Sequence, residues 1–210
     1  NNPLLFDNSA SATPLVPYQR YILWMLRLVL PMKTLASQRC IIPSCGQTYT
    51  VYEPRTKCEK CGNLLDVKYE SHPNPELKEV FYERRNHRGD IFNESGVWRF
   101  RELINFPSVD CNNYDDYSKI FVSLDGAEGC TKPFHLSKVA EYVGVRSENL
   151  WLQFEGYNPT GSFKDNGMAT AFTHAKMLGV KKVACASTGN TSSSAAAFAA
   201  NEGIEAIVFM

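Results

Sequence analysis

The feature that most constrains the fold is an alternation of short apolar runs with a helical segment. Residues 182–186 form an apolar run that predicts a strand, and the alanine-rich residues 191–201 predict a helix that ends at Gly203. Residues 205–209 predict a second strand. Two strands joined by a helix make a βαβ unit, in which the strands run parallel. The sequence therefore predicts an α/β fold with parallel strands.

The alternation of strand and helix extends upstream to about residue 118. Residues 120–124 and 150–154 are short apolar runs and predict strands. Apolar spacing predicts helices over residues 136–143 and 163–178, and Gly179 ends the second. One face of that second helix would carry five apolar residues: Met168, Ala171, Phe172, Ala175 and Leu178.

Two loop-to-helix junctions carry the residues best suited to chemistry. Lys164 lies in residues 158–167, where proline and glycine predict a turn, and its amine can form a Schiff base with an aldehyde. Residues 187–191 open the next helix, so their N–H groups and hydroxyls suit a carboxylate, and Gly189 allows close backbone approach. Taken singly, a solvated lysine and an ordinary helix cap explain the two junctions. Taken together, the junctions favour a binding site.

Four of the seven cysteines form two closely spaced pairs, Cys40 with Cys45 and Cys58 with Cys61. Zinc binds four thiolates tetrahedrally, and paired cysteines on tight turns supply two each. The pattern predicts a structural zinc site in a ribbon-like module, and the alternative is four unligated cysteines in a degenerate ribbon. An odd cysteine total without a secretory signal argues against a disulfide framework. The remaining cysteines have no such partners: Cys111, Cys130 and Cys185.

Composition excludes several other classes of protein. The chain has 22 basic and 22 acidic residues, so it lacks the basic excess of a nucleic-acid binder. The apolar run at residues 21–30 contains Arg27 and is well short of the roughly 20 residues that cross a bilayer. No small-residue cleavage site follows it. We interpret Met32 as the true start and residues 1–31 as upstream sequence or a leader; the alternative is an amphipathic helix that docks on the body.

The 210 residues divide by pattern into four parts. Residues 1–36 are predicted as a poorly ordered extension, and residues 37–70 as the zinc-ribbon-like module. Residues 71–117 are a connector with a short helix around residues 75–85, and residues 118–210 are the α/β body. Because the last predicted strand reaches the final residues with no helix after it, we expect the chain to be truncated.

Four segments resemble the threonine synthase family: residues 97–103, 125–134, 158–168 and 187–199. Members of this family are pyridoxal-phosphate enzymes of fold type II. The resemblance therefore implies a three-layer αβα architecture, which the family shares with tryptophan synthase β. The cysteine ribbon also resembles one found in many members. The resemblance covers about residues 37–210 and is most specific in the two loops. It departs from the family in the Gly-Glu-Gly-x-Thr-Pro-Leu turn, which here carries an inserted Lys132.

The resemblance implies roles for individual residues of the two loops. Lys164 would form the Schiff base with pyridoxal 5′-phosphate, Phe163 would shape the cofactor pocket, and Asn190 would bond the ring oxygen of the cofactor. The substrate carboxylate would be held by a set of small and hydroxyl residues: Ser187, Thr188, Gly189 and Thr191. The glycine-rich loop that holds the cofactor phosphate in this family would lie downstream of residue 210.

The resemblance also implies a reaction, the conversion of O-phospho-L-homoserine and water to L-threonine and phosphate. The full-length protein would be a cytoplasmic homo-oligomer, and the chain alone is expected to be inactive or nearly so because half of the cofactor cleft is absent. A serine or threonine dehydratase or a cysteate synthase would use the same lysine. An alternative from another class is a non-catalytic fragment that carries a zinc-ribbon module.

Overall fold

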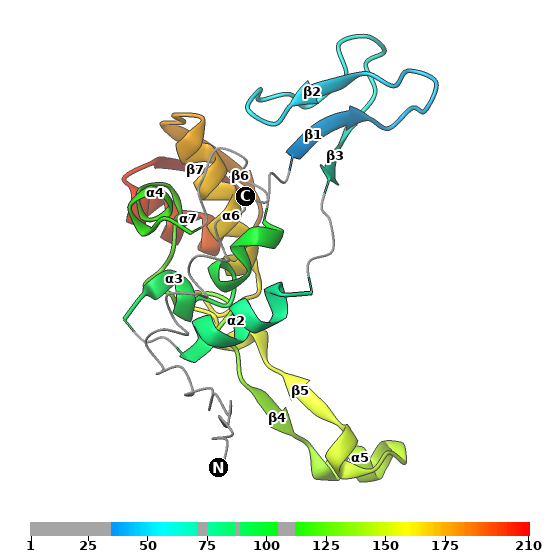
Figure 1. Cartoon of the computed structure of the whole chain (residues 1–210), viewed down its shortest axis with the longest axis vertical. Coiled ribbons are helices and arrows are strands. Elements are labelled where there is room, and N and C mark those ends of the chain that lie inside the picture. Colours follow the sequence, from blue (N-terminus) through cyan, green and yellow to red (C-terminus); the bar gives the residue numbers. More distant parts are fainter. Residues whose placement is uncertain (1–34, 71–74, 87–88, 105–111) are drawn as a thin grey trace, which may run out of the picture. The chain divides into compact units, whose positions relative to one another are not determined.

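The computed structural model describes residues 35–70, 75–86, 89–104 and 112–210, which belong to one unit of the chain, Lys33–Met210 (Figure 1). The predictions for residues 1–34 and for Cys111 lie outside the described residues. None of the helices in the described ranges has the length and apolar character that a bilayer-spanning segment needs.

The cysteine module, residues 35–70, is a three-stranded antiparallel sheet in the order β2-β1-β3 (Figure 1). Its strands are β1 (Leu35–Cys40), β2 (Thr48–Thr50) and β3 (Leu65–Glu70). Strand β1 lies in the centre, and Cys40 at its end is paired with Leu65 of β3. The Gln38 side chain donates to the carbonyls of Thr50 and Glu53, each at 2.8 Å. This pairing places the first cysteine at a strand end, beside the turns that carry the other three.

Four short helical segments follow the module in sequence: α2 (Leu77–Asn86), α3 (Ile91–Glu94), the 3-10 helix η1 (Trp98–Leu103) and α4 (Tyr114–Ile120). The helix predicted around residues 75–85 is confirmed as α2. Asp90 and Asn113 cap the N-termini of α3 and α4 with their side-chain oxygens. A buried ion pair between Arg84 and Glu102 fixes α2 to η1.

The strand predicted at residues 120–124 is wrong. Helix α4 ends at Ile120, and the next three residues belong to no strand. Their backbone groups bind side chains instead: the N–H of Val122 donates to the Thr173 hydroxyl at 2.8 Å, and its carbonyl accepts from the Trp98 indole at 2.7 Å. Val122 is fully buried, so the apolar run reflects burial in the core and not sheet pairing.

Residues 133–153 form a hairpin that carries short helices at its end (Figure 1). Its elements are β4 (Pro133–His135), α5 (Ser137–Val143), η2 (Ser147–Asn149) and β5 (Trp151–Gln153). Strands β4 and β5 are antiparallel, with Phe134 paired to Leu152. The helix predicted at residues 136–143 and the strand predicted at residues 150–154 are therefore confirmed.

The βαβ unit predicted near the end of the chain is confirmed, because strands β6 and β7 pair in parallel. The elements of this part are η3 (Glu155–Tyr157), α6 (Lys164–Met177), β6 (Lys182–Ala186), α7 (Asn190–Glu202) and β7 (Glu205–Phe209). Gly203 ends α7 in the left-handed conformation, with φ of 64°, and Gly179 follows α6 with φ of 67°. Together with the other helices and strands these elements make a mixed α/β fold.

The core joins the helical segments to the βαβ unit through aromatic side chains. Trp98 stacks on Phe121 with ring centroids 4.0 Å apart, and Phe172 of α6 stacks on Phe198 of α7 at 5.9 Å. The partly buried Cys185 packs against this core from β6, as a small apolar side chain can.

The buried face of α6 differs from the predicted face. Phe172 is buried as expected, but Ala171 is exposed. Ala169 and Thr173 are buried in its place, since Thr173 binds the backbone of Val122. The hydroxyl of Thr173 thus satisfies a backbone group that no strand pairs, which explains why a polar residue lies on the buried face of α6.

Candidate active site

Lys164 is the first residue of α6 and follows a tight loop, here called the lysine loop (residues 158–164). Gly161 has φ of 81°, a conformation that glycine adopts without strain. The Ser162 hydroxyl accepts a hydrogen bond from the Lys164 N–H at 3.2 Å. The Lys164 Nζ lies 4.7 Å from the centre of the exposed Phe163 ring. The amine is therefore held beside an aromatic face at the surface.

Asp165 connects the lysine loop to α7. Its fully buried carboxylate accepts hydrogen bonds from the Thr160 N–H at 2.7 Å and from the Thr160 hydroxyl at 2.5 Å. It also accepts from the Ser194 hydroxyl at 2.5 Å. A first-turn aspartate is ordinary for a helix start, where it favours the positive end of the dipole. Here its contacts show a second role, which is to join two elements.

The second junction, here called the serine loop (residues 187–191), runs from β6 into α7. The Ser187 hydroxyl accepts from the Gly189 N–H at 3.2 Å, and the Ser192 hydroxyl donates to the carbonyls of Ser187 and Gly189 at 2.7 and 2.8 Å. These bonds fix the loop from within. Asn190 is exposed at the start of α7. The first N–H groups of a helix have no partner inside it, so this helix start suits an anion.

The serines after the loop do not form the solvated face that an ordinary helix cap would have. Ser192 and Ser194 are buried, whereas Ser193 is exposed. The Ser192 hydroxyl donates to the serine loop, and the Ser194 hydroxyl donates to Asp165. The sequence alone did not distinguish these roles, because the three serines are consecutive and only the packing of α7 separates them.

Helices α6 and α7 begin at the same end of the structure. Asp165 near the start of α6 contacts Ser194 near the start of α7, and further along both helices Phe172 contacts Phe198. Two helices that make contacts in this order run in the same direction. Lys164 and the serine loop therefore lie at the starts of neighbouring helices, and their use as one shared site stays a prediction.

A turn at residues 127–134 packs beneath the lysine loop and contains a carboxylate that sequence analysis missed. Glu128 is fully buried and accepts hydrogen bonds from the hydroxyls of Ser95 and Ser123 at 2.6 and 2.8 Å. Gly96 and Gly129 make a close backbone contact, since a Cβ on Gly96 would lie 2.0 Å from the Gly129 carbonyl oxygen. The two glycines in this turn and in its partner segment were the signal that could have revealed the contact.

Asn158 joins this turn to the lysine loop. Its buried side chain accepts from the Gly129 N–H at 2.7 Å and donates to the carboxylate of Glu155 at 2.9 Å. Asn166 donates to the same carboxylate at 3.3 Å. The Oδ1 atom of Asn166 is buried and has no hydrogen-bond partner among the described residues. An unpaired buried acceptor two residues after Lys164 is the kind of group that a bound molecule satisfies.

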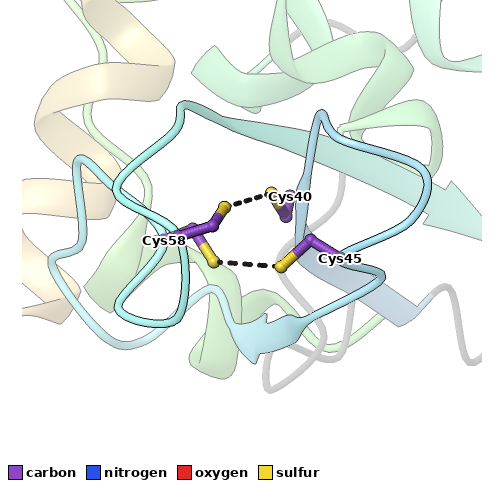
Figure 2. A group of neighbouring side chains, drawn as sticks. Cys40, Cys45 and Cys58 are labelled. Carbon is purple, nitrogen blue, oxygen red and sulfur yellow. Dashed lines mark hydrogen bonds between the residues drawn. The ribbon is translucent and has the colours of Figure 1, made fainter.

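The four paired cysteines come together as predicted, and Figure 2 shows Cys40, Cys45 and Cys58 directed toward one another. All four sulfur atoms, including that of Cys61, lie within 4.8 Å of one another. The Sγ atoms of Cys40 and Cys61 are 3.4 Å apart, and those of Cys45 and Cys58 are 3.7 Å apart. Four thiolates about 2.3 Å from a tetrahedral zinc ion would be about 3.8 Å from one another, so the spacing fits such an ion.

The groups around the cysteines favour thiolates at two positions. The hydrogen bond from Tyr49 is the main cause that lowers the pKa of Cys58 to about 6. The backbone of Asn63 lowers the pKa of Cys61. A thiolate is the form that binds a metal, and the surroundings favour it at Cys58 and Cys61. Burial and the neighbouring cysteines, by contrast, raise the pKa of Cys40 and of Cys45.

In comparisons with known proteins, residues 124–210 match a family described as "Pyridoxal-phosphate dependent enzyme". Threonine synthase from Methanocaldococcus jannaschii is 41% identical over 173 residues, which are 82% of this chain and 37% of that protein. Threonine synthase from Methanosarcina acetivorans is 34% identical over 173 residues, which are 82% of this chain and 36% of that protein. The Mycobacterium tuberculosis threonine synthase is 59% identical over 83 residues, which are 40% of this chain and 22% of that protein.

Residues 124–210 are therefore similar to pyridoxal-phosphate-dependent enzymes, and most of the chain is similar to part of two threonine synthases, with identities of 41% and 34%. The relatives named here are all threonine synthases, the family that the two loops resemble. The chain spans little more than a third of the length of the two archaeal relatives that match most of it, 37% and 36%.

Proposed function

We propose that this chain is the N-terminal part of a threonine synthase, which converts O-phospho-L-homoserine and water to L-threonine and phosphate. The observation that carries the proposal is the pairing of Lys164 with the serine loop at neighbouring starts of α6 and α7. An amine and an anion-binding helix start are the two groups that an aldehyde cofactor and an amino-acid substrate need. The complete domain would be a three-layer αβα structure, of which β6, α7 and β7 supply one unit.

The described residues fit pyridoxal phosphate at the amine and at the ring. Lys164 offers a surface amine beside the Phe163 ring, and Asn166 has an unpaired buried acceptor. A Cβ added to Gly189 would meet no atom within 4 Å, so the backbone of the serine loop faces open space that a bound molecule can enter. When bound, pyridoxal phosphate supplies an electron sink for carbanion chemistry.

Each residue of the proposed site has a distinct task. Lys164 would hold the cofactor and then move protons at Cα and Cβ of the substrate, while phosphate leaves from Cγ and water adds at Cβ. Phe163 would bound the cofactor ring, and Asn190 would donate to the ring oxygen. The substrate carboxylate would bind at the helix start formed by Ser187, Thr188, Gly189 and Thr191.

Attachment of the cofactor at Lys164 is a direct test. The chain is mixed with pyridoxal phosphate, reduced with borohydride and digested, and the peptides are weighed by mass spectrometry. We expect the added mass on the peptide that contains Lys164, loss of that product in Lys164→Ala, and no change in the control Lys181→Ala, whose side chain is exposed outside both loops. Equal labelling of wild type and Lys164→Ala would refute the assignment.

The reaction itself is tested by products. In the full-length protein we expect phosphate release from O-phospho-L-homoserine together with threonine. Release of ammonia and a keto acid from serine or threonine would instead indicate a dehydratase, and formation of cysteate would indicate a cysteate synthase. A full-length protein that binds no pyridoxal phosphate would favour the non-catalytic module. Cell fractionation and size-exclusion chromatography test the proposed cytoplasmic location and homo-oligomer.

We also propose that the cysteine cluster holds a structural zinc ion. The sulfur spacing supports it, and four thiolates leave no coordination position for substrate. Protein purified without chelator should contain about one equivalent of zinc. Cys58→Ser should lose it, and Cys130→Ser should retain it, because Cys130 lies outside the cluster. Metal content well below one equivalent in the wild type would refute the site.

A further inference from the structure

Tyr49 occupies a defined place beside the cysteine cluster. It lies on β2, and its hydroxyl oxygen is 3.5 Å from the Sγ of Cys58. The same oxygen accepts a hydrogen bond of 2.9 Å from the N–H of Glu59, the residue after that cysteine. One phenol thus contacts both the sulfur and the backbone of the turn that carries Cys58 and Cys61.

The direction of the contact with sulfur follows from the second bond. Because the Glu59 N–H already donates to the phenol oxygen, the hydroxyl proton is available for the sulfur. A cysteine that binds zinc is a thiolate and has no proton to give. In the metal-bound protein Tyr49 can therefore only donate, and Cys58 can only accept.

The face of the Tyr49 ring contacts a cation. The guanidinium of Arg55 lies 4.5 Å from the ring centre, within the range of a cation–π contact. Arg55 is in turn paired with the carboxylates of Glu53 and Glu59, which flank it in sequence. Arg55 thus contacts the Tyr49 ring and is itself held by two ion pairs.

The other donors to the cluster come from nearby in sequence. Cys40 accepts from the N–H of Ile42 at 3.5 Å, and Cys61 accepts from the side chain of Asn63 at 3.5 Å. Each of these donors is two residues from its sulfur. Tyr49 is nine residues away on a strand, so its bond alone of these three links the second cysteine pair to the sheet.

We propose that Tyr49 is a positioning residue of the metal site, which donates its hydroxyl proton to the Cys58 thiolate and slows release of the ion. The inference rests on the proposed zinc site and adds to it a residue that is not a ligand. Outer donors of this kind orient metal ligands, and their removal typically costs about 10- to 100-fold in metal affinity.

The test compares Tyr49→Phe with the wild type and with Tyr69→Phe, which makes the same chemical change at an exposed tyrosine of β3. Zinc transfer to a chromogenic chelator is followed over time, and zinc affinity is measured by competition. We expect Tyr49→Phe to bind zinc about tenfold more weakly and to release it correspondingly faster. Tyr69→Phe should match the wild type.

A spectroscopic measurement separates this role from a loss of folding. With cobalt(II) in place of zinc, the sulfur-to-metal charge-transfer band reports the electron density on the thiolates. Loss of a hydrogen bond to Cys58 should move that band to lower energy in Tyr49→Phe, and only folded, metal-loaded protein gives the signal. An unchanged band and unchanged release would overturn the role of Tyr49 while leaving the zinc site intact. Failure of the wild type to retain zinc or cobalt would overturn both.

Discussion

Replacement of Asp165 by alanine should loosen the lysine loop from α7. The carboxylate is fully buried, and its two oxygens accept from different donors. One oxygen accepts from the Thr160 N–H, and the other accepts from the hydroxyls of Thr160 and Ser194. Alanine removes both acceptors and leaves the buried Ser194 hydroxyl without them.

The size of the effect follows from the number of hydrogen-bond donors that lose their acceptor. A hydrogen bond to a charged group contributes about 1.5 to 3 kcal/mol. Thr160 is partly exposed, so its hydroxyl can bind water in place of the carboxylate. The other two bonds, from the Thr160 N–H and from the Ser194 hydroxyl, are counted in full. We therefore expect Asp165→Ala to lower the free energy of unfolding by about 3 to 6 kcal/mol.

Asparagine is the matched control, because its shape is nearly that of aspartate. Its oxygen can accept from the Thr160 N–H, and its NH2 group can donate to the two hydroxyls, which accept as well as donate. Asp165→Asn should therefore keep all three contacts and lose only the charge, about 1 kcal/mol. Asp116→Ala, at an exposed position in the first turn of α4, measures the effect of a helix-start carboxylate alone.

Urea unfolding followed by tryptophan fluorescence gives the free energies, and hydrogen exchange of the Thr160 amide reports the bond itself. Protection of that amide should be lost in Asp165→Ala and kept in Asp165→Asn. If Asp165→Ala unfolds no more easily than Asp116→Ala, the carboxylate acts only through the helix dipole. If asparagine is as damaging as alanine, charge rather than hydrogen bonding holds the loop.

Three further predictions concern the stability of the fold, and urea unfolding measures the first two. Gly96→Ala should cost more than about 2 kcal/mol because its Cβ would overlap the Gly129 carbonyl, whereas Gly144→Ala, at φ of 71° with no atom near its Cβ, should cost about 1 kcal/mol. Arg84→Met should cost about 3 kcal/mol or more, since it leaves the buried Glu102 carboxylate without its partner. Removal of metal by a chelator should unfold the cysteine module and leave the fluorescence of the buried core unchanged, which circular dichroism and fluorescence together can check.

The parts of the fold that could be predicted from sequence are those with local signals. The βαβ unit was predictable because alanine-rich and apolar segments are separated by Gly203, which adopts φ of 64°. The cysteine cluster was predictable because short spacing brings two sulfurs together on each turn. In both cases the information lies within about ten residues of the element, where chain geometry limits the alternatives.

The parts that could not be predicted depend on partners distant in sequence. Residues 120–124 resemble a strand, but the hydrogen bonds of Val122 are made by Thr173 and Trp98, which lie 51 and 24 residues away. The buried role of Glu128 depends on Ser95, 33 residues away. Burial of a polar residue costs little free energy only when a hydrogen-bond partner is present. A single sequence does not show which distant residue that partner is.

The buried polar residues explain how the candidate site keeps its geometry. Glu128 fixes the turn at residues 127–134, Asn158 ties that turn to the lysine loop, and Asp165 ties the lysine loop to α7. An apolar contact tolerates sliding, whereas a hydrogen bond in a buried, low-dielectric setting loses its energy when donor and acceptor shift by an ångström or so. A site that must hold an amine and an anion-binding helix start at a fixed separation therefore benefits from polar links more than from additional apolar packing. The position of Lys164 is then set by buried polar residues of the neighbouring turn and loop, and substitutions of these residues should change the alignment of the lysine loop.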